Sequence, residues 1–546
     1  MVHVAQGFYT HVHTSIMNDE FDALVHETFY KLMEFRPNLA TFFGLHQYDT
    51  QMPAATREAQ EAYITFFSEY LKKFQDLPHE GLSPDRKIDR KLMISILKYH
   101  LFGEGKIRKW EKDPDLSEAV GDTIFLLFSR EFAPFDTRLE SIVSRLSKCP
   151  QFIRESKTKV RNPVKLWVDM AVEGCNALPS FFKIISETAQ QKGLDTTELD
   201  EASAKTADAL SSYVEWITTL PCEGEPILGK DLFEELLKVR ELGLTAKEIL
   251  KIGEDYLSKE KARLRKLASL IDPSSSAEEV RTTIRKEHPP TFQEALKAYE
   301  KAILKMRDTL RKKEFASIPE GESLTVQETP TFIRHLIPTA AYIPPAKFEK
   351  DQTGIYLVTP VEGDSLREHN YSAIVNTSVH EAYPGHHLHS VWINKNPSLV
   401  RILSNAPEFA EGWAHYCEER MRDYGLNDIK LQIVQTTDVI FRAVRIIIDV
   451  NLHCGEMTFD EAVSLLKSET GMEQYAVVTE VKWYTKEPGY PLSYLLGKHL
   501  FLQLQKDVQE HMKEKYSEKQ FHDTLLQGGS MPFIYLREEL RLKGML

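Results

Sequence analysis

The chain has 546 residues, of which 42% are hydrophobic and 27% charged, and its 81 acidic residues outnumber the 68 lysines and arginines to give a net charge of −13. This composition is ordinary for a globular protein, and the length exceeds what one hydrophobic core usually supports. Two or three subdomains or one large helical body are therefore expected. The acidic balance argues against a nucleic-acid-binding protein, whose binding surface would be basic.

The N-terminal residues show no charged segment followed by an apolar run, and no window approaches the ~20 apolar residues of a membrane span. The five cysteines are few, odd in number and far apart: Cys149, Cys175, Cys222, Cys417 and Cys454. This pattern is typical of reduced thiols and not of a disulfide framework or a four-cysteine zinc site. The sequence therefore predicts a cytoplasmic protein that does not act at a membrane.

Helical periodicity dominates from about residue 19 to residue 315. Apolar side chains recur at the spacing of one helix face, as in Phe21, Leu24, Val25, Phe29 and Leu32. The charged segment 246–270 repeats this pattern among many lysines and glutamates, which indicates a helix with one solvent-facing side. We interpret residues 1–315 as a helical N-terminal part that forms one wall of a cleft.

The helical residue pattern is interrupted between about residues 315 and 370. Prolines at positions 319, 330, 338, 344, 345 and 360 exclude a long helix there. Residues 354–359 (Gly-Ile-Tyr-Leu-Val-Thr) are the best strand candidate, because they are rich in β-branched and aromatic side chains. We predict a small β-sheet or hairpin just before a helix that begins near residue 371.

The remainder of the chain returns to helical periodicity. Helices are predicted over residues 371–394, 407–424, 428–453, 458–468, 474–483 and 491–512. The predicted fold class is therefore mainly α, a large helical body with a central cleft. Residues 316–546 form its second part, and the two parts are subdomains of one fold and not independent domains.

Residues 378–389 (Ser-Val-His-Glu-Ala-Tyr-Pro-Gly-His-His-Leu-His) hold the densest group of coordinating and acid–base side chains in the chain. The stretch nearly matches the H-E-x-x-H motif of zinc hydrolases, in which two histidines four residues apart share one helix face and bind the ion. Here Pro384 stands four residues after His380. The standard spacing is interrupted, so the second ligand has to be another histidine.

Pro384 and Gly385 indicate how the motif is rebuilt. Pro384 cannot donate to the carbonyl four residues earlier, and its ring clashes with that turn, while Gly385 can adopt an irregular backbone. A bulge of two residues at this point would bring His386 to the place of the usual second histidine. We predict His380 and His386 as metal ligands, with His387 as the alternative for the second.

A catalytic zinc site needs a third protein ligand and one open position. Glu411 is the candidate, because it lies about 30 residues past His380 and precedes Gly412 and Trp413 on a helix that could pack against the first; a solvated helix glutamate is the alternative. Glu381, next to the first ligand, would face the open position as general base for a water. The expected cofactor is one Zn²⁺ per chain, although Mn²⁺ or Co²⁺ accept similar ligands.

Four blocks resemble, in their order, the domain-of-unknown-function 885 family. They are His-Glu-x-x-Pro-Gly-His-His (380–387), Glu-Gly-Trp-Ala (411–414), Arg-Ala-Val-Arg with the Asp and His that follow it (442–453), and Pro-Gly through Leu-Ser-Tyr (488–494). Segments 44–49, 342–345 and 354–356 fit as well, so the resemblance spans nearly the whole chain. Members of this family look like helical zinc peptidases related in general fold to the angiotensin-converting-enzyme and thermostable-carboxypeptidase clans.

The resemblance implies a zincin-like helical body with the same three ligands and the same base as the spacing predicts. His389 and His415 stand where the family pattern has Gln and Leu, and either is an alternative ligand. In the later blocks, Asp449 would orient a ligand histidine, and His453, one helical turn further on, would contact the substrate or the transition state.

Two arginines and two tyrosines complete the candidate site. Arg442 and Arg445 are candidates for binding a carboxylate of the substrate, with a structural ion pair as the alternative. Tyr494, in the Pro-Gly block, is the preferred hydrogen-bond donor to the oxyanion that forms during amide hydrolysis, and Tyr484 is the alternative. Strand 354–359 would pair with extended substrate backbone, or else form an ordinary hairpin.

The sequence therefore predicts a zinc-dependent peptidase that hydrolyses short peptides. Carboxypeptidase or dipeptidase action is expected, because a cleft enclosed by helices excludes folded proteins. The alternatives are a metal-dependent amidase or esterase with a non-peptide substrate, and a helical protein that binds peptides without cleaving them. Short peptides are the expected partners, with neither nucleic acid nor membrane, and the sequence does not specify an oligomeric state.

Overall fold

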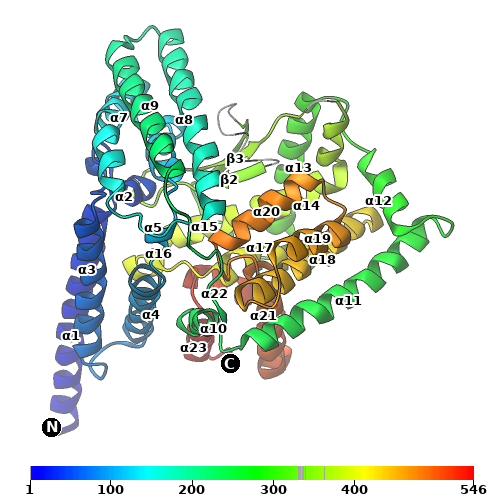
Figure 1. Ribbon diagram of the computed structural model, residues 1–546. Helices are drawn as coiled ribbons and strands as arrows, with labels where there is room; N and C mark the ends of the chain where they lie inside the picture. Colours follow the sequence, from blue (N-terminus) through cyan, green and yellow to red (C-terminus); the bar gives the residue numbers. More distant parts are fainter. Residues whose placement is uncertain (1, 330–333, 335–336, 338–339, 362) are drawn as a thin grey trace. The chain divides into compact units, whose positions relative to one another are not determined.

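The computed structural model describes residues 2–329, 334, 337, 340–361 and 363–546. The protein is mainly α-helical with one small three-stranded sheet, which confirms the predicted fold class. The chain forms two compact units, Met1–Pro226 with Ala346–Asp351, and Ile227–Pro345 with Gln352–Leu546. Figure 1 follows the chain through both units by colour.

All regular secondary structure described in the first unit is helical. Its elements are α1 (Val2–Phe35), α2 (Pro37–Phe43), η1 (His46–Tyr48), α3 (Arg57–Asp76), α4 (Pro84–His100), η2 (Leu101–Ile107), α5 (Lys109–Lys112), α6 (Ser117–Ser129), α7 (Phe135–Ser156), α8 (Lys165–Gln191) and α9 (Thr197–Thr218). Helix α9 packs along both α7 and α8, as Figure 1 shows. The guanidinium of the buried Arg145 donates to the carbonyl of Gln51 (3.1 Å) and to the hydroxyl of Thr41 (2.6 Å). Arg145 thereby links α7 to α2 and to the segment after η1.

The second unit contains the sheet and the remaining helices. The helices are α10 (Lys230–Val239), α11 (Ala246–Ile271), α12 (Ala277–Arg285), α13 (Phe292–Lys313), η4 (Gly363–His369), α14 (Tyr371–Glu381), α15 (His386–Lys395), α16 (Leu399–Leu403), α17 (Pro407–Arg420), α18 (Ile429–His453), α19 (Phe459–Thr470), α20 (Gln474–Lys486), α21 (Ser493–Met512), η5 (Lys513–Lys515), α22 (Glu518–Gly528) and α23 (Phe533–Leu542). Capping boxes at Thr245, Ser276 and Thr458 begin three of them, because each side chain and the glutamate three residues on satisfy free N–H groups.

The two units divide near residue 226, whereas the prediction from the sequence divided the chain near residue 315, where the prolines become frequent. Helix α11, the charged segment recognised in the sequence, lies along α18 of the second unit. A Cβ on Gly253 would lie 2.7 Å from Cγ2 of Ile446, so the two helices meet with no room for a side chain. The proline-rich segment that begins near residue 315 leads into the sheet and does not mark a boundary between units. The cleft between the two predicted parts stays a prediction.

The sheet has the strand order β1–β3–β2. Strand β1 (Glu322–Glu328) is parallel to β3 (Gln352–Val358), and β2 (Ala340–Ile343) is antiparallel to it. Tyr356 on β3 is opposite Val326 on one side and Tyr342 on the other. The expectation that this strand pairs with substrate backbone is therefore wrong, because both of its edges already hydrogen-bond to neighbouring strands.

Helices α17 and α21 cross at two glycines. A Cβ on Gly412 would lie 2.5 Å from the backbone of Gly497, and a Cβ on Gly497 would lie 2.0 Å from the carbonyl oxygen of Glu408. Only glycine permits this approach of the two backbones. Since Gly412 directly follows Glu411, the crossing sets the position of the predicted third ligand.

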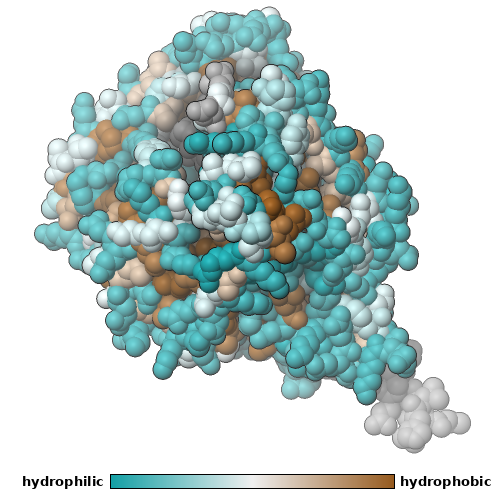
Figure 2. All heavy atoms as spheres, turned by 90° about the vertical axis from the view of Figure 1, so that its right-hand side faces the viewer, coloured by the Kyte–Doolittle hydropathy of each residue, from teal (hydrophilic) through white to brown (hydrophobic). Residues whose placement is uncertain are grey.

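On the face shown in Figure 2, hydrophilic residues cover most of the surface and hydrophobic residues form smaller separate patches. The large hydrophobic residues with the most exposure are Leu270, Leu304 and Tyr475, on three different helices. Within the described ranges, no helix has both the length and the apolar character required to cross a membrane.

Candidate metal centre

The backbone between α14 and α15 accommodates two extra residues. Helix α14 ends at Glu381 and α15 begins at His386, and a cis peptide bond joins Tyr383 to Pro384 between them. The N–H of Gly385 donates to the carbonyl of Val379 (3.0 Å), six residues earlier instead of the four of a regular helix. This hydrogen bond agrees with the two-residue insertion predicted from the Pro-Gly pair.

Gly385 and Trp413 hold this turn in place. A Cβ on Gly385 would lie 1.7 Å from the carbonyl oxygen of His380, so no other residue fits at this position without a rearrangement of the backbone. The indole Nε1–H of Trp413 donates to the carbonyl of Pro384 (2.8 Å). Helix α17 is thus attached to the turn one residue before Gly385.

The turn and the helix crossing bring His380, His386 and Glu411 together. One possible ligand atom from each lies within 4.8 Å of those of the other two. The carboxylate oxygen Oε2 of Glu411 lies 3.8 Å from Nε2 of His380 and 3.4 Å from Nε2 of His386. Two imidazoles and one carboxylate are a donor set that zinc hydrolases use, so these side chains fit a zinc ion in both type and spacing.

Glu418 orients the first histidine. Nδ1 of His380 lies 2.6 Å from Oε1 of Glu418, so the ring donates from Nδ1, and its other nitrogen, Nε2, is the one that lies toward Glu411. Burial opposes a charge on His380, but Glu418, Glu381 and Glu411 together outweigh it and raise the pKa of His380 to about 9, so a metal ion would have to displace the proton on Nε2. Asn376 and His415 also lie against the Glu418 carboxylate, at 3.2 and 3.3 Å. Glu418 was not predicted, although it lies two helical turns after Glu411 on the same face.

Tyr490 orients the carboxylate. Its hydroxyl donates to Oε1 of Glu411 (2.7 Å), which leaves Oε2 for the two histidines. Burial would raise the pKa of Glu411, but His386, His380 and Tyr490 together lower it to about 2. The prediction from sequence missed Tyr490 and named Tyr494 instead, four residues later in the same block.

Asp449 holds the loop that carries Tyr490. Its carboxylate accepts from the N–H of Gly489 (3.0 Å) and from that of Leu492 (3.1 Å), while Arg240 donates to the carbonyl of Gly489 (2.5 Å). The prediction that Asp449 orients a ligand histidine is therefore wrong. It acts on the centre through Tyr490, because both of its oxygens bind the backbone of this loop.

We expect replacement of Tyr490 by phenylalanine to weaken metal binding by about 10- to 100-fold, because loss of an outer hydrogen bond to a ligand typically has this effect. Competition with a chelating indicator measures the affinity. Tyr516→Phe is the matched control. The hydroxyl of Tyr516 also takes part in a hydrogen bond, which it accepts from the amide of Gln505 (3.0 Å), and neither residue is near the three ligands in the sequence. Equal metal affinity in the two variants would contradict the role given to Tyr490.

Glu381 is the last residue of α14 and is half-buried beside His380. Within the described part of the chain, no side chain or backbone group hydrogen-bonds to its carboxylate. Burial raises the pKa of Tyr356 on β3 well above its usual value, and the charge of Glu381 adds to this effect. Glu381 thus keeps its acceptor oxygens available next to the candidate ligands.

His387, the alternative second ligand, belongs to a different cluster. Its Nε2 lies 2.8 Å from Oε2 of Glu322 on β1, and its Nδ1 lies 3.0 Å from the hydroxyl of Tyr342 on β2. The ring is fully buried. Both nitrogens are occupied, so His387 attaches α15 to the sheet, and the structure brings His386 and not His387 to Glu411.

The other two histidines considered as ligands also lie outside the group of three. His389 is buried against the ring of Phe409, with 4.8 Å between ring centroids, and burial lowers its pKa to about 3. His415 is fully buried, with its Nδ1 3.3 Å from Glu418 and its ring centroid 6.0 Å from that of His380. Both packing environments keep these rings in the helical core.

His453 and Tyr484 are structural, contrary to prediction. The fully buried ring of His453 stacks on Phe233, and its Nε2 lies 3.0 Å from the carbonyl oxygen of Tyr484. The buried hydroxyl of Tyr484 accepts from Nε of Arg445 (3.1 Å). These partners leave neither His453 nor Tyr484 exposed to a substrate.

The two arginines have different surroundings. Arg445 is buried, and besides Tyr484 it binds Glu480 through Nη2 (2.8 Å), so it forms the structural ion pair that was the alternative. Arg442 is partly exposed, and its nearest carboxylate is that of Asp438 at 3.9 Å. Tyr494 lies beside both guanidinium groups, 5.7 Å from that of Arg442.

Tyr494 also lies close to the candidate ligands. Its ring centroid is 6.0 Å from that of Tyr490, whose hydroxyl reaches Glu411. Burial raises the pKa of Tyr494, the charge of Glu411 adds to the effect, and the two arginines oppose it. The hydroxyl of Tyr490 is used by Glu411, so Tyr494 stays the candidate donor to an oxyanion.

The model of a family of bacterial proteins of unknown function, DUF885, matches residues 37–540. The chain belongs to the DUF885 family. This match includes every residue of the candidate metal centre and confirms the family that the sequence blocks indicated. No curated protein matches the sequence.

Two solved structures share the fold of this DUF885 chain. One, "a putative lipoprotein of unknown function" from Shewanella oneidensis, has a TM-score of 0.78 and 20% identity over 96% of this chain and 99% of its own. The other, "the putative lipoprotein from Colwellia psychrerythraea", has a TM-score of 0.85 and 18% identity over the same shares. At these identities the likeness concerns the fold alone, and the cytoplasmic location expected for this chain stays a prediction.

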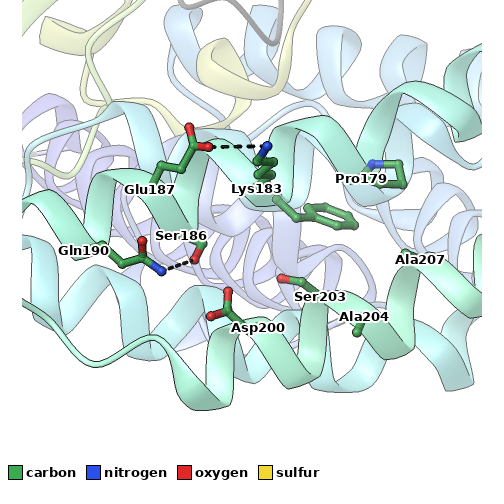
Figure 3. Close-up of a pocket in the computed structure, with 10 residues that line it drawn as sticks. Pro179, Lys183, Ser186, Glu187, Gln190, Asp200, Ser203, Ala204 and Ala207 are labelled. Atoms are coloured by element: carbon green, nitrogen blue, oxygen red, sulfur yellow. Dashed lines mark hydrogen bonds and ion pairs between the residues drawn. The ribbon is translucent and has the colours of Figure 1, made fainter.

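A separate groove of about 420 Å³ lies between α8 and α9 in the first unit of this DUF885 protein (Figure 3). Polar side chains pair along α8 on one side of the groove: Lys183 lies 3.6 Å from Glu187, and the amide of Gln190 donates to the hydroxyl of Ser186 (3.4 Å). It contains no histidine or cysteine. The groove has no side-chain set like that of the candidate metal centre.

Proposed function

We propose that this protein is a metal-dependent peptidase that hydrolyses short peptides. The observation that carries the proposal is the convergence of His380, His386 and Glu411 from three helices, with the carboxylate of Glu381 beside them. Metal-dependent hydrolases combine these two features, a group of ligands and an adjacent base. The family's name and the names of the similar structures specify no reaction, so the proposal rests on the chemistry of these side chains.

His380 and His386 would bind the ion through Nε2, and Glu411 through the carboxylate oxygen that Tyr490 leaves free. When bound, zinc supplies Lewis acidity that polarises a substrate carbonyl and makes a nearby water more acidic. Manganese and cobalt accept similar ligands. Glu418 supports binding by keeping the proton of His380 on Nδ1.

Glu381 would act as the general base. Its carboxylate accepts a proton from the attacking water as the new C–O bond forms, and it then delivers that proton to the nitrogen of the leaving amine as the C–N bond breaks. The position of Glu381, directly after His380 and free of hydrogen bonds within the described chain, suits both steps. Tyr494 would donate a hydrogen bond from its hydroxyl to the oxygen that gains negative charge in the transition state.

Metal analysis and a peptide assay test the proposal. We expect about one zinc, manganese or cobalt ion per chain, hydrolysis of a library of two- to five-residue peptides, loss of activity after dialysis against a chelator, and recovery when the metal is restored. The same preparation is tested on simple esters and on non-peptide amides. Peptide hydrolysis that persists in metal-free protein, or turnover of only non-peptide substrates, would overturn the proposal.

A further inference from the structure

One face of helix α18 passes close to the candidate ligands. Asp438 and Arg442, four residues apart, are both partly exposed on this face. The side-chain amide of Asn376 donates to Asp438 (2.9 Å) and to Glu418 (3.2 Å). Because Glu418 binds His380, this face of α18 lies next to the group that orients the first ligand.

Within the described part of the chain, the hydrogen-bond donors of Arg442 are largely unused. The 3.9 Å from Nη1 to Asp438 is too long for a hydrogen bond. Its Nε is buried and has no hydrogen-bond partner within the described residues. Arg445, one helical turn further on, differs in both respects, since Tyr484 and Glu480 accept its donors.

Aromatic rings hold the guanidinium of Arg442 beside the centre. It lies 4.9 Å from the ring of Phe441 and 5.7 Å from that of Tyr494. Tyr494 in turn packs on Tyr490, whose hydroxyl reaches Glu411. A bound molecule that contacts both the ligand group and Arg442 would therefore pass alongside Tyr494.

We infer that Arg442 binds the free C-terminal carboxylate of the substrate, so that the centre acts on peptides with an unblocked C-terminus. A guanidinium presents two parallel N–H groups that match a carboxylate, and hydrogen bonds between charged groups are stronger than those between neutral ones. The inference rests on the proposed peptidase function and adds to it the substrate class, short peptides with a free carboxylate. Arg442 is here a specificity residue, and the hydrolytic step does not require it.

Calorimetry on the metal-loaded Glu381→Gln protein, in which turnover is blocked, tests the inference. The ligands are an N-acetylated dipeptide with a free carboxylate and the same dipeptide as its amide. We expect the acid to bind about 30-fold more tightly than the amide, a ratio typical of a hydrogen bond to a charged group. In the Glu381→Gln, Arg442→Gln double variant the ratio should fall below about 3-fold. Arg442→Lys should give an intermediate ratio, because lysine keeps the charge and loses the planar pair of donors.

Arg281→Gln is the matched control. Its side chain is 19% exposed, as is that of Arg442, and it lies on α12 with Glu278 as its partner. The control should keep the preference for the acid. Equal affinity for acid and amide in Glu381→Gln overturns the inference even if the Arg442 variants do not fold, and so does an unchanged preference in folded Arg442→Gln.

Hydrolysis by the wild-type protein separates this inference from the proposed function. If acid and amide peptides are cleaved equally and metal is required, the inference fails and the peptidase proposal stands. If the acid binds preferentially through Arg442 and no peptide is cleaved by metal-loaded protein, the carboxylate site stands and the peptidase proposal fails.

Discussion

Replacing Glu381 by glutamine is expected to lower kcat/KM for peptide hydrolysis by about 10³-fold, within the range typical of a general base. Glutamine has the shape of glutamate but cannot accept the proton of the attacking water. The three candidate ligands stay intact, so the metal content should equal that of the wild type. The free energy of unfolding should change by less than about 0.5 kcal/mol, because Glu381 has no hydrogen bond within the described chain to lose.

Glu510→Gln provides the control for this substitution. Glu510 is a glutamate on α21 whose side chain is 66% exposed and pairs only loosely with Lys506 at 3.7 Å. Its replacement should leave hydrolysis unchanged. If Glu381→Gln keeps more than about one tenth of the wild-type kcat/KM with full metal content, Glu381 is not the base.

Replacing His386 by alanine is expected to remove the metal. Two ligands instead of three cannot hold the ion through dialysis, so the content should fall from about one ion per chain to less than about one tenth. His386 is partly exposed and its partner is Glu411, so the metal-free variant should fold like metal-free wild type. Plasma emission spectroscopy gives the metal content, and circular dichroism gives the melting temperature.

His387→Ala is the matched control for this experiment, because the two histidines are adjacent and have different partners. The variant leaves the buried carboxylate of Glu322 with one hydrogen bond fewer, at a cost of about 1–3 kcal/mol in the free energy of unfolding. Folded protein should nevertheless keep its metal. Loss of metal from folded His387→Ala, with retention by His386→Ala, would reverse the assignment.

Local patterns predicted most of the secondary structure. Apolar periodicity located the helices of both units, and β-branched and aromatic residues located β3, because each pattern reports how one segment presents its side chains. Which segments pack against one another was harder to predict. The long charged helix α11 belongs to the second unit because Gly253 allows it to touch Ile446, and nothing in the α11 segment itself reveals a contact almost 200 positions away.

In the candidate site, too, local features were predicted from the sequence and long-range contacts were not. The Pro-Gly pair and its neighbouring histidines predicted the helix break and the place of His386, since the chemistry of proline and glycine acts on the nearest turn. The i, i+4 spacing of Asp449 and His453 placed them correctly on one helix and left open what that face meets. In the structure Asp449 meets a backbone loop and His453 meets the carbonyl of Tyr484.

By itself, the sequence determined which donors this protein offers and where its helix is interrupted, because both depend on residues within one or two turns. Only the tertiary structure decided which donors converge. The crossing at Gly412 and Gly497 sets the position of Glu411, the sheet engages His387 through Glu322, and the Asp449 loop brings Tyr490 to the carboxylate. These contacts join segments far apart in the chain, and spacing along one helix specifies only the neighbours on that helix.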